Sequence, residues 1–270
     1  MPTIVRIRDA GDPRLEVYRA VRERDLAGRE GLFVAEGRVV LEKAVAAMPE
    51  AIASVLVTDA RLESLAEILA GLPAGTPVYA AGQGAMDEVV GFPIHRGILA
   101  VGRRPDRDPA TLLAGMPPEA LVVGLVGIAN HDNMGGIFRN AAAFGAAAVL
   151  LDDTCCDPLY RKAIRVSVGA ALTVPFARAG TAAALMAGLG RAGFETLALS
   201  PRGAVELADL RRPPKAAVLF GAEGPGLPEA VLAEARGVRI AMAGGFDSLN
   251  VATTSGIVLH HLAAQRNRPV

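Results

Sequence analysis

Three segments in the second half of the chain carry polar side chains in places where an α/β protein could use them for chemistry. The first is GIANHDNMGGIFRNAAAFG, residues 127–145, in which a strand end leads through a polar turn into a helix. The apolar face of that helix leaves Arg139 and Asn140 on its polar side. Asn133 is expected to cap the helix, whose first amides could receive an anion. A capped turn without any function is the alternative reading of this segment.

The second segment is LFGAEGPGLPEAVL, residues 219–232, where three glycines surround Glu223 directly after an apolar strand. Glycines at the carboxyl end of a strand let the backbone approach a ligand closely, and open α/β sheets bind their ligands in a crevice at those ends. The alternative is a Gly-Pro-Gly turn that places Glu223 in solvent.

The third segment is RIAMAGGFDSLNVATTSGIVLHHL, residues 239–262, which reads as a strand, a glycine-containing loop and a helix. Ser248 or Asn250 is expected to cap this helix. Its small residues, from Ala252 to Gly256, permit close packing against another helix. That contact could belong to a dimer face or to the core of one chain.

A sheet must hold these segments together. Apolar runs alternate with helix-period segments along the whole chain, a pattern typical of βαβ units and a mostly parallel sheet. In the second half we expect strands at 121–127, 147–151, 172–176, 194–199, 216–220 and 238–242, and a final helix over 249–265. In the first half we expect helices over 13–27, 37–47 and 59–69, and strands at 32–35, 52–57, 77–80 and 97–101.

A division into two domains is also expected. Residues 103–119, RRPDRDPATLLAGMPPE, are rich in proline and charge, as linkers are. The sequence therefore predicts a first α/β domain over 1–104, a linker over 105–119 and a second α/β domain over 120–270.

Composition narrows the class of protein. Hydrophobic residues make up 51% of the 270, which predicts a folded chain, and no apolar run approaches the roughly 20 residues of a membrane helix. No apolar segment follows the first arginines, so we expect no signal peptide and a cytoplasmic location. The 28 basic and 28 acidic residues cancel, which disfavours nucleic-acid binding by bulk charge but allows a local basic patch. No cysteine or histidine has zinc-ligand spacing, so we expect no metal.

In order and spacing, the three segments resemble the signature motifs of the SpoU (TrmH-like) RNA ribose methyltransferases of the SPOUT superfamily. The matching residues of the first motif are Asn133, Gly136, Arg139, Asn140 and Ala141, with one residue of difference in spacing; those of the second are Gly221, Glu223, Gly226 and Leu227; those of the third are Ile240, Met242, Ser248, Leu249, Asn250 and Val251. Where the family's third motif has proline, this chain has Ala241. Residues 33–45, FVAEGRVVLEKAV, resemble the ribosomal-protein-like substrate-binding domain that many members carry.

The resemblance implies a fold and a set of partners. The second domain would be a parallel-sheet SPOUT domain with a trefoil knot, and the smaller α/β domain before it would bind RNA. It implies that S-adenosylmethionine is the cofactor and that a homodimer is required, because the family's active site combines residues of two subunits. The presence of the first domain favours ribosomal RNA over transfer RNA as the substrate and a role in rRNA processing.

The resemblance also implies roles for individual residues. The cofactor would be held by backbone groups near Leu199, Gly221, Ile240, Met242 and Leu249. Transfer of its methyl group to a ribose 2′-hydroxyl would use Arg139, Asn133, Glu223, Ser248 and Asn250. In this reading Arg139 stabilises the developing alkoxide or clamps the adjacent phosphate, and Glu223 orders the loop or holds Arg139. Arg139 and Arg165 would contact RNA.

Two other classes of protein compete with this reading. A catalytically inactive RNA-binding protein of the same fold would not need this set of polar residues. An ordinary nucleotide-binding oxidoreductase would need a G-x-G-x-x-G fingerprint, which the chain lacks.

Overall fold

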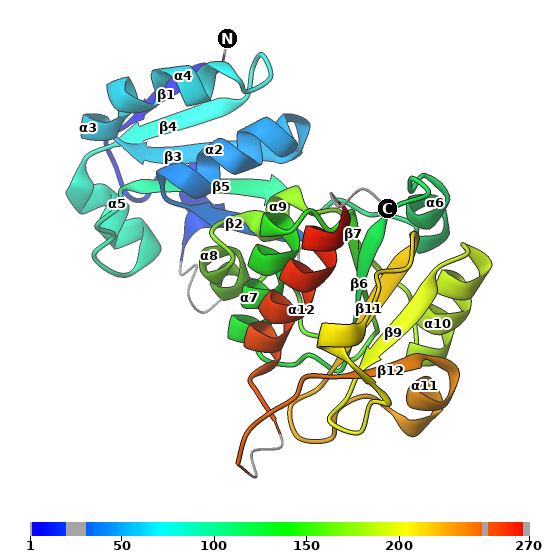
Figure 1. The fold of residues 1–270 in the computed structure, drawn as a ribbon. Coiled ribbons are helices and arrows are strands. Elements are labelled where there is room, and N and C mark those ends of the chain that lie inside the picture. The colour runs from blue at the N-terminus through cyan, green and yellow to red at the C-terminus, as the bar shows by residue number, and fades with distance from the viewer. Residues whose placement is uncertain (1, 20–30, 245–247, 267–270) are drawn as a thin grey trace. The chain divides into compact units, whose positions relative to one another are not determined.

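The computed structural model describes residues 2–19, 31–244 and 248–266. Contacts between Cα atoms divide the chain into two compact units (Figure 1). The first consists of Met1–Pro105 and Asp157–Thr173, and the second of Asp106–Cys156 and Val174–Val270. In the described ranges, no helix is both long enough and apolar enough to cross a membrane.

The described part of the first unit is built on a five-stranded mixed sheet in the order β1-β4-β3-β5-β2. The strands β1, β4 and β3 pair in parallel, whereas β5 is antiparallel to both β3 and β2. The strands are β1 (Thr3–Ile7), β2 (Leu32–Glu36), β3 (Ile52–Thr58), β4 (Pro77–Ala81) and β5 (Ile98–Arg103). The helices are η1 (Pro13–Tyr18), α2 (Arg38–Ala47), η2 (Pro49–Ala51), α3 (Asp59–Leu62), η3 (Glu63–Leu65), α4 (Ala66–Ala70), α5 (Gln83–Val90), α8 (Arg161–Val166) and α9 (Ala170–Thr173).

Specific polar contacts attach the segment Asp157–Thr173 to the first unit. The guanidinium of Arg161 lies 2.6 Å from the Glu36 carboxylate, and both side chains are mostly buried. The ring of Phe92 lies under the same guanidinium, 5.2 Å from its centre. Lys43 Nζ donates a 2.8 Å hydrogen bond to the carbonyl of Val168. This segment therefore groups with the first unit, although it follows β7 of the second unit in the chain.

The described part of the second unit contains a seven-stranded sheet in the order β10-β12-β9-β11-β6-β7-β8, and every pair is parallel. The strands are β6 (Leu121–Val126), β7 (Ala148–Leu151), β8 (Phe176–Arg178), β9 (Glu195–Leu199), β10 (Val205–Glu206), β11 (Ala216–Gly221) and β12 (Arg236–Arg239). All residues of β6 and β7 are buried, as expected for parallel strands covered on both faces.

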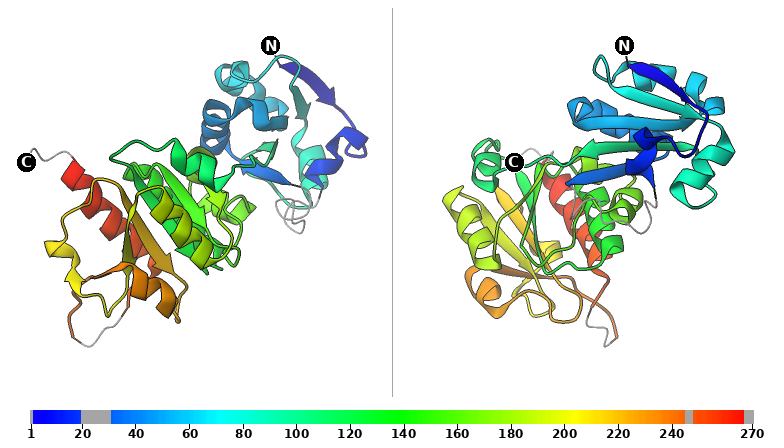
Figure 2. Two further views of the ribbon diagram at one scale, coloured as in Figure 1. Left: turned by 90° about the vertical axis from the view of Figure 1, so that its right-hand side faces the viewer. Right: turned by 180° about the vertical axis from the view of Figure 1, so that it is seen from behind.

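Helices cover both faces of this sheet (Figure 2). The buried side chains of α6 (Pro109–Ala114), α10 (Ala182–Arg191) and α11 (Glu229–Glu234) join the core on one face. On the other face, α7 (His131–Ala143) packs against α12 (Val251–Arg266), and the short helix η4 (Leu207–Asp209) contacts α12. The second unit is thus a parallel α/β domain covered by helices on both faces, and the first is a smaller unit with a mixed sheet.

One strand predicted over 172–176 was wrong. Residues Ala170–Thr173 form the short helix α9, and β8 begins only at Phe176. Val168 and Gly169 both have positive φ, 53° and 80°, so the backbone turns sharply before α9. The run of apolar residues there is buried in a helix, and apolar runs alone do not separate a buried helix from a strand.

Other boundaries differ less. The strand expected over 238–242 ends at Arg239, so 240–242 follow the strand rather than extend it. The helix expected over 59–69 is divided into α3, η3 and α4. Of the helix expected over 13–27, the structure has the 3-10 helix η1, and residues 20–27 lie outside the described residues. The part of the chain expected as a linker carries α6, whose Leu113 is buried in the second unit's core.

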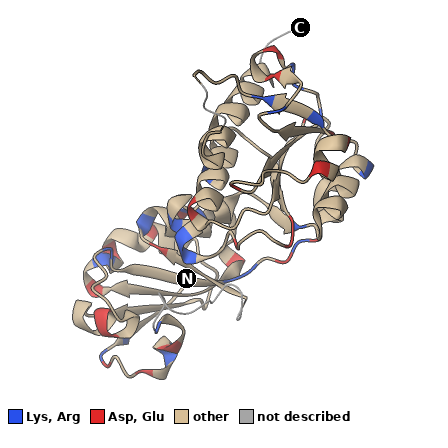
Figure 3. Cartoon of the chain, turned by 90° about the horizontal axis from the view of Figure 1, so that it is seen from below, with Lys and Arg blue, Asp and Glu red and all other residues tan. Residues whose placement is uncertain are grey.

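Positive and negative side chains are interspersed along the elements of both units (Figure 3). Several exposed arginines have carboxylate partners, for example Arg6 with Asp59 and Arg236 with Glu195. This pairing agrees with the balanced charge of the sequence, and each such exposed pair contributes roughly 0–1 kcal/mol.

Candidate active site

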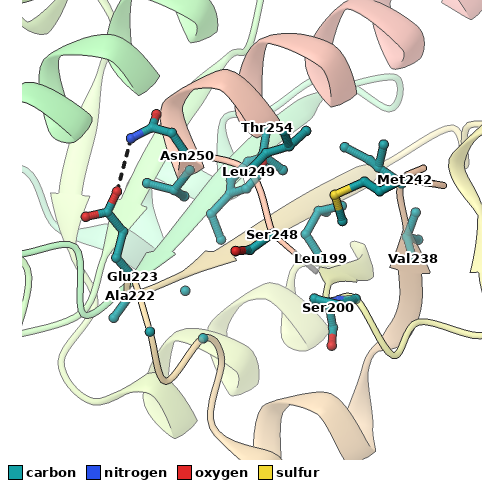
Figure 4. A pocket seen from close by; sticks show the side chains of 17 residues that line it. Leu199, Ser200, Ala222, Glu223, Val238, Met242, Ser248, Leu249, Asn250 and Thr254 are labelled. Carbon is teal, nitrogen blue, oxygen red and sulfur yellow. Dashed lines mark hydrogen bonds between the residues drawn. The ribbon is translucent and has the colours of Figure 1, made fainter. Parts of the chain in front are cut away.

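A cavity of about 390 Å³ opens at the carboxyl ends of β9, β11 and β12 (Figure 4). Its walls come from the loops after these strands and from the start of α12. The lining residues are Leu199, Ser200, Pro201, Phe220, Gly221, Ala222, Glu223, Gly224, Gly226, Val238, Ile240, Met242, Ser248, Leu249, Asn250, Val251 and Thr254. Open parallel sheets bind their ligands at this edge, so the topology and the cavity indicate the same site.

The two ends of the cavity differ in polarity. Leu199, Val238 and Met242 lie together toward one end, whereas Glu223 and Asn250 lie at the other (Figure 4). Leu249 is 43% exposed, which is unusual for a large apolar side chain. The cavity therefore offers an apolar surface for a flat ring and, at its other end, hydrogen-bonding groups.

Gly221 is required by the close approach of two backbone segments. A Cβ at this position would lie 2.3 Å from the backbone carbon of Gly226 and 2.4 Å from the nitrogen of Leu227. The loop folds back so tightly that Ala222 and Gly226 form an isolated antiparallel bridge. A side chain at 221 would displace this loop, which forms one wall of the cavity.

Asn250 connects all three sequence segments. Its Nδ2 donates hydrogen bonds to Asn133 Oδ1 (2.9 Å) and to Glu223 Oε1 (3.0 Å). Its Oδ1 accepts hydrogen bonds from the amides of Ala252 (2.9 Å) and Thr253 (3.2 Å). The prediction that Asn250 caps the last helix is therefore confirmed, and the same side chain holds the Glu223 loop next to α7.

The predicted capping role of Asn133 was wrong. Asn130 is the N-cap of α7, and its side chain accepts from the amides of Asp132 (2.7 Å) and Asn133 (3.4 Å). Asn133 instead lies in the first turn and is buried, with its Oδ1 turned to Asn250. Two asparagines three positions apart could both serve as caps by sequence, and the buried one takes the long-range contact.

Small residues bring α7 and α12 into close contact. A Cβ on Gly136 would lie 2.7 Å from the Cβ of Ala252, and one on Gly256 would lie 3.2 Å from Asn140 Nδ2. Asn140 Nδ2 donates to the Ala252 carbonyl (2.7 Å) and to Ser255 Oγ (2.9 Å). The small residues of α12 thus serve packing within the chain, which was one of the two expected uses.

Neither Arg139 nor Arg165 is among the residues that line this cavity. Arg139 lies on the exposed side of α7 and is not among the lining residues. It makes no side-chain hydrogen bond or ion pair with any residue in the described ranges, and Glu223 contacts Asn250 rather than Arg139. Arg165 is exposed at the end of α8, in the segment that groups with the first unit.

Sequence reasoning missed several lining residues. Ser200 and Pro201 follow β9, and Thr254 lies one turn into α12. The position of Ser200 and Pro201 directly after a parallel strand was a usable signal, because ligands bind beyond the carboxyl ends of such strands. Thr254 had no comparable signal, since its exposure to the cavity depends on how α12 is oriented.

The thiol of Cys155 lies next to the carboxyl end of β6. It is buried, and Cys155 Sγ contacts the amide of Ile128 (3.3 Å) and the carbonyl of Leu125 (3.4 Å). Burial raises the pKa of this thiol to about 12 and is the largest effect. The hydrogen bond from the Ile128 amide lowers the pKa, and the side chain of Asp152 raises it further. In the described ranges, no group of three or more His, Cys, Asp or Glu side chains could hold a metal ion.

A parallel α/β unit with a glycine-walled cavity at its strand ends defines a small-molecule-binding α/β protein. Residues 120–260 match the SpoU rRNA Methylase family. An uncharacterised tRNA/rRNA methyltransferase of Mycobacterium bovis is 41% identical over 263 residues, which cover 93% of this chain and 89% of that protein. The chain belongs to the SpoU (TrmH-like) family of SPOUT RNA methyltransferases, which confirms the resemblance of its three motifs.

Solved structures share the fold over nearly the whole chain. An AdoMet-bound rRNA methyltransferase from Sinorhizobium meliloti is 21% identical with a TM-score of 0.81, over 98% of this chain and 99% of that one. A structure described as an RNA 2′-O ribose methyltransferase is 25% identical with a TM-score of 0.76, over 97% of this chain and 99% of that one.

Proposed function

We propose that this protein transfers the methyl group of S-adenosylmethionine to a ribose 2′-hydroxyl of RNA. The observation that carries the proposal is the link made by Asn250, which joins Asn133 and Glu223 at the polar end of the cavity. Residues from three distant segments meet there, as a reaction centre requires. Membership of an RNA methyltransferase family supports the reaction class, and the relative named for 2′-O ribose methylation supports the ribose as acceptor.

The cavity fits the proposed cofactor in size and chemistry. Its volume of about 390 Å³ is within the range of roughly 300–1,000 Å³ that small-molecule sites have. Leu199, Ile240, Met242 and Leu249 would hold the adenine by apolar contact, and the tight backbone at Gly221 would approach the cofactor closely. When bound, S-adenosylmethionine supplies an electrophilic methyl group. The Sinorhizobium meliloti structure, which is described as AdoMet bound, supports the choice of cofactor.

The polar residues would bind and orient the acceptor ribose. Asn133 and Asn250 form a fixed pair, so the Asn250 side chain has little freedom to turn. Ser248, an exposed residue of the cavity lining, would hydrogen-bond the ribose or its phosphate. Polar groups held in place before the reaction lower the barrier because they need no reorganisation during it.

Arg139 would act from a second subunit. It is exposed on α7 and free of ion pairs with described residues, so it is available to an RNA phosphate or to the cavity of a partner. A guanidinium binds phosphate oxygens in a bidentate manner, and it would stabilise charge on the attacking oxygen. We propose a homodimer on this ground, with the active site completed between subunits.

The first domain, over 1–104, would bind the RNA substrate and deliver it to the second domain. Arg165 is exposed and available for a phosphate. We favour ribosomal RNA over transfer RNA as the substrate, and thus a cytoplasmic role in rRNA processing. The trefoil knot that the resemblance implies belongs to the same proposal.

The experiment is methyl transfer from labelled S-adenosylmethionine to total RNA that lacks its own modifications. The wild-type protein is expected to label RNA, and Arg139→Ala is expected to lose most of that label. Binding of S-adenosylmethionine and of NAD is measured on the same preparations, and only the former should bind. Cofactor binding without any labelled RNA would favour the catalytically inactive RNA-binding protein. Binding of NAD instead would favour the oxidoreductase.

A further inference from the structure

Glu223 has the position and chemistry of a proton acceptor. We propose that its free carboxylate oxygen removes the proton from the ribose hydroxyl during methyl transfer. This inference rests on the proposed function and deepens it, because it assigns the general base of that same site.

The reaction needs such a group. A ribose hydroxyl is a weak acid, and its oxygen cannot end as a neutral ether unless its proton leaves. The positively charged guanidinium of Arg139 is a poor acceptor because it is already protonated at any working pH. It suits the stabilisation of negative charge, which is a different task.

The cavity offers a single candidate among its described lining residues. Glu223 is the only lining residue with a side chain that ionises between pH 2 and 12. Its hydrogen-bond partner is uncharged: Asn250 at the start of α12 donates to it directly, and Asn133 on α7 contacts that same Asn250. α7 also carries the charged or titratable side chains of His131, Asp132 and Arg139, and none of them lines the cavity.

The hydrogen bonds leave one oxygen of Glu223 available. Asn250 Nδ2 donates to Oε1 at 3.0 Å, and Oε2 accepts no hydrogen bond from a residue in the described ranges. Because the Asn250 amide is itself fixed by Asn133 and by the first turn of α12, it holds the carboxylate in one orientation. Figure 4 shows Glu223 at the end of the cavity away from Leu199, Val238 and Met242, where the acceptor would enter.

A lone pair of the ribose 2′-oxygen forms the new bond to the methyl carbon, and the bond between that carbon and sulfur breaks with its electron pair on sulfur. The electrons of the O–H bond stay on oxygen, and the proton passes to Oε2 of Glu223. The positive sulfonium and the negative carboxylate are converted to a neutral thioether and a neutral acid. Glu223 is exposed, so it returns the proton to water.

The test compares Glu223→Gln and Glu223→Ala with the wild-type protein in single-turnover methyl transfer. Removal of a general base lowers the rate by about 10²–10⁴-fold, so we expect a loss in that range for both variants. We also expect the decline of the wild-type rate toward acid pH to be absent from both variants. Sodium formate should restore part of the rate of Glu223→Ala but not that of Glu223→Gln, because only the shortened side chain leaves room for an external carboxylate.

The matched control is Glu229→Gln, which makes the same chemical change on an exposed residue of α11 paired with Arg202 and outside the cavity lining. It should keep the wild-type rate and pH profile. Dissociation constants for S-adenosylmethionine and thermal unfolding are measured for every variant. Both should remain near the wild-type values for Glu229→Gln and for Glu223→Gln, whose amide oxygen can still accept the hydrogen bond from Asn250. Glu223→Ala loses that bond, so its rate is compared at saturating cofactor. These two measurements distinguish the loss of a proton acceptor from the loss of the cofactor site or of the fold.

Two results would overturn the inference while leaving the proposed function in place. One is an active wild-type protein whose Glu223→Gln variant keeps its rate. The other is a slow variant that retains the wild-type acid decline and gains nothing from formate, which would make Glu223 a positioning residue. A wild-type protein that transfers no methyl group to RNA would instead contradict the proposed function.

Discussion

Asn250 Nδ2 lies 2.9 Å from Asn133 Oδ1, although 117 positions separate the two residues in the chain. The bond joins the first turn of α7 to the start of α12, and Asn250 lines the cavity. It also explains why an asparagine is buried at position 133, since a buried amide oxygen without a partner is costly. The polar end of the site is thus built into the packing of two helices.

We predict that Asn250→Ala weakens both folding and cofactor binding. The change removes the cap of α12 and the two hydrogen bonds to Asn133 and Glu223. Loss of a cap alone costs about 1 kcal/mol of the free energy of unfolding. Calorimetric titration with S-adenosylmethionine should show weaker binding, because the Glu223 loop is no longer tied to α12.

Thr181→Ala is the control for that prediction. Thr181 caps α10 through a 3.2 Å bond to the amide of Ala184, and it does not line the cavity. It should lose a similar amount of stability and bind the cofactor as the wild-type protein does. Equal binding by both variants would show that the Asn250 link has no part in the cofactor site.

The contact of α7 with α12 predicts opposite effects for two glycine-to-alanine changes. In Gly136→Ala the new methyl group would lie 2.7 Å from the Cβ of Ala252, which cannot turn away, so the helices must separate. Overpacking of this kind costs roughly 1–3 kcal/mol. In Gly188→Ala of α10 the nearest atom, in Leu113, is 3.9 Å away, and better helix propensity should add about 0.5–1 kcal/mol. Chemical denaturation of both variants checks the signs; a stabilised Gly136→Ala would mean that the helices are not held this closely.

The raised pKa of Cys155 predicts a loss of stability at high pH. The folded value of about 12 exceeds the ordinary value of 9.0, so the unfolded chain ionises first as pH rises. The stabilisation is complete below pH 9 and is lost between pH 9 and 12, at a slope that approaches about 1.4 kcal/mol per pH unit. The measurement is the free energy of unfolding of the wild-type protein and of Cys155→Ala at pH 7 to 10.5. The other titrating groups are the same in both proteins, so their effects cancel in the difference between the two free energies. If the stability of both proteins changed with pH in the same way, the raised pKa of Cys155 would be contradicted.

If the active site combines residues of two subunits, two inactive variants should complement each other when they are mixed. Arg139→Ala and Glu223→Gln are each expected to be nearly inactive, and mixed dimers would contain one cavity with both native residues. Mixing the two, after dissociation and reassociation, should therefore restore about a quarter of wild-type activity, from half of the dimers with one native site each. If Arg139 acts in its own subunit, every cavity in the mixture lacks one residue and no activity returns.

Much of the second unit could be predicted from its sequence because its strands are continuous apolar runs between glycines. β6, β7, β9 and β11 lie close to their expected positions for this reason. The 172–176 segment has the same composition, yet its first two residues belong to α9, which follows the positive φ angles at Val168 and Gly169. In the first unit, β1 at the N-terminus was missed because Arg6 interrupts a short strand with exposed residues.

The candidate site was predictable as a set of residues but not as a geometry. Glycine spacing placed Gly221 and Glu223 after a strand, and both line the cavity. The roles of Asn133 and Asn250 depend on the orientation of α7 against α12, which no local pattern encodes. A capping preference is equally well met by Asn130 or Asn133, and only the contact with Asn250 separates them.

The central claim is that the acceptor is a ribose hydroxyl, and the alkali stability of the labelled RNA tests it most directly. Alkali cleaves RNA through attack by the 2′-oxygen, so a 2′-O-methyl group protects the linkage that follows it. After complete alkaline hydrolysis of RNA labelled by this protein, the account predicts the methyl label in dinucleotides. Label recovered only in mononucleotides would place the methyl group on a base and contradict the account.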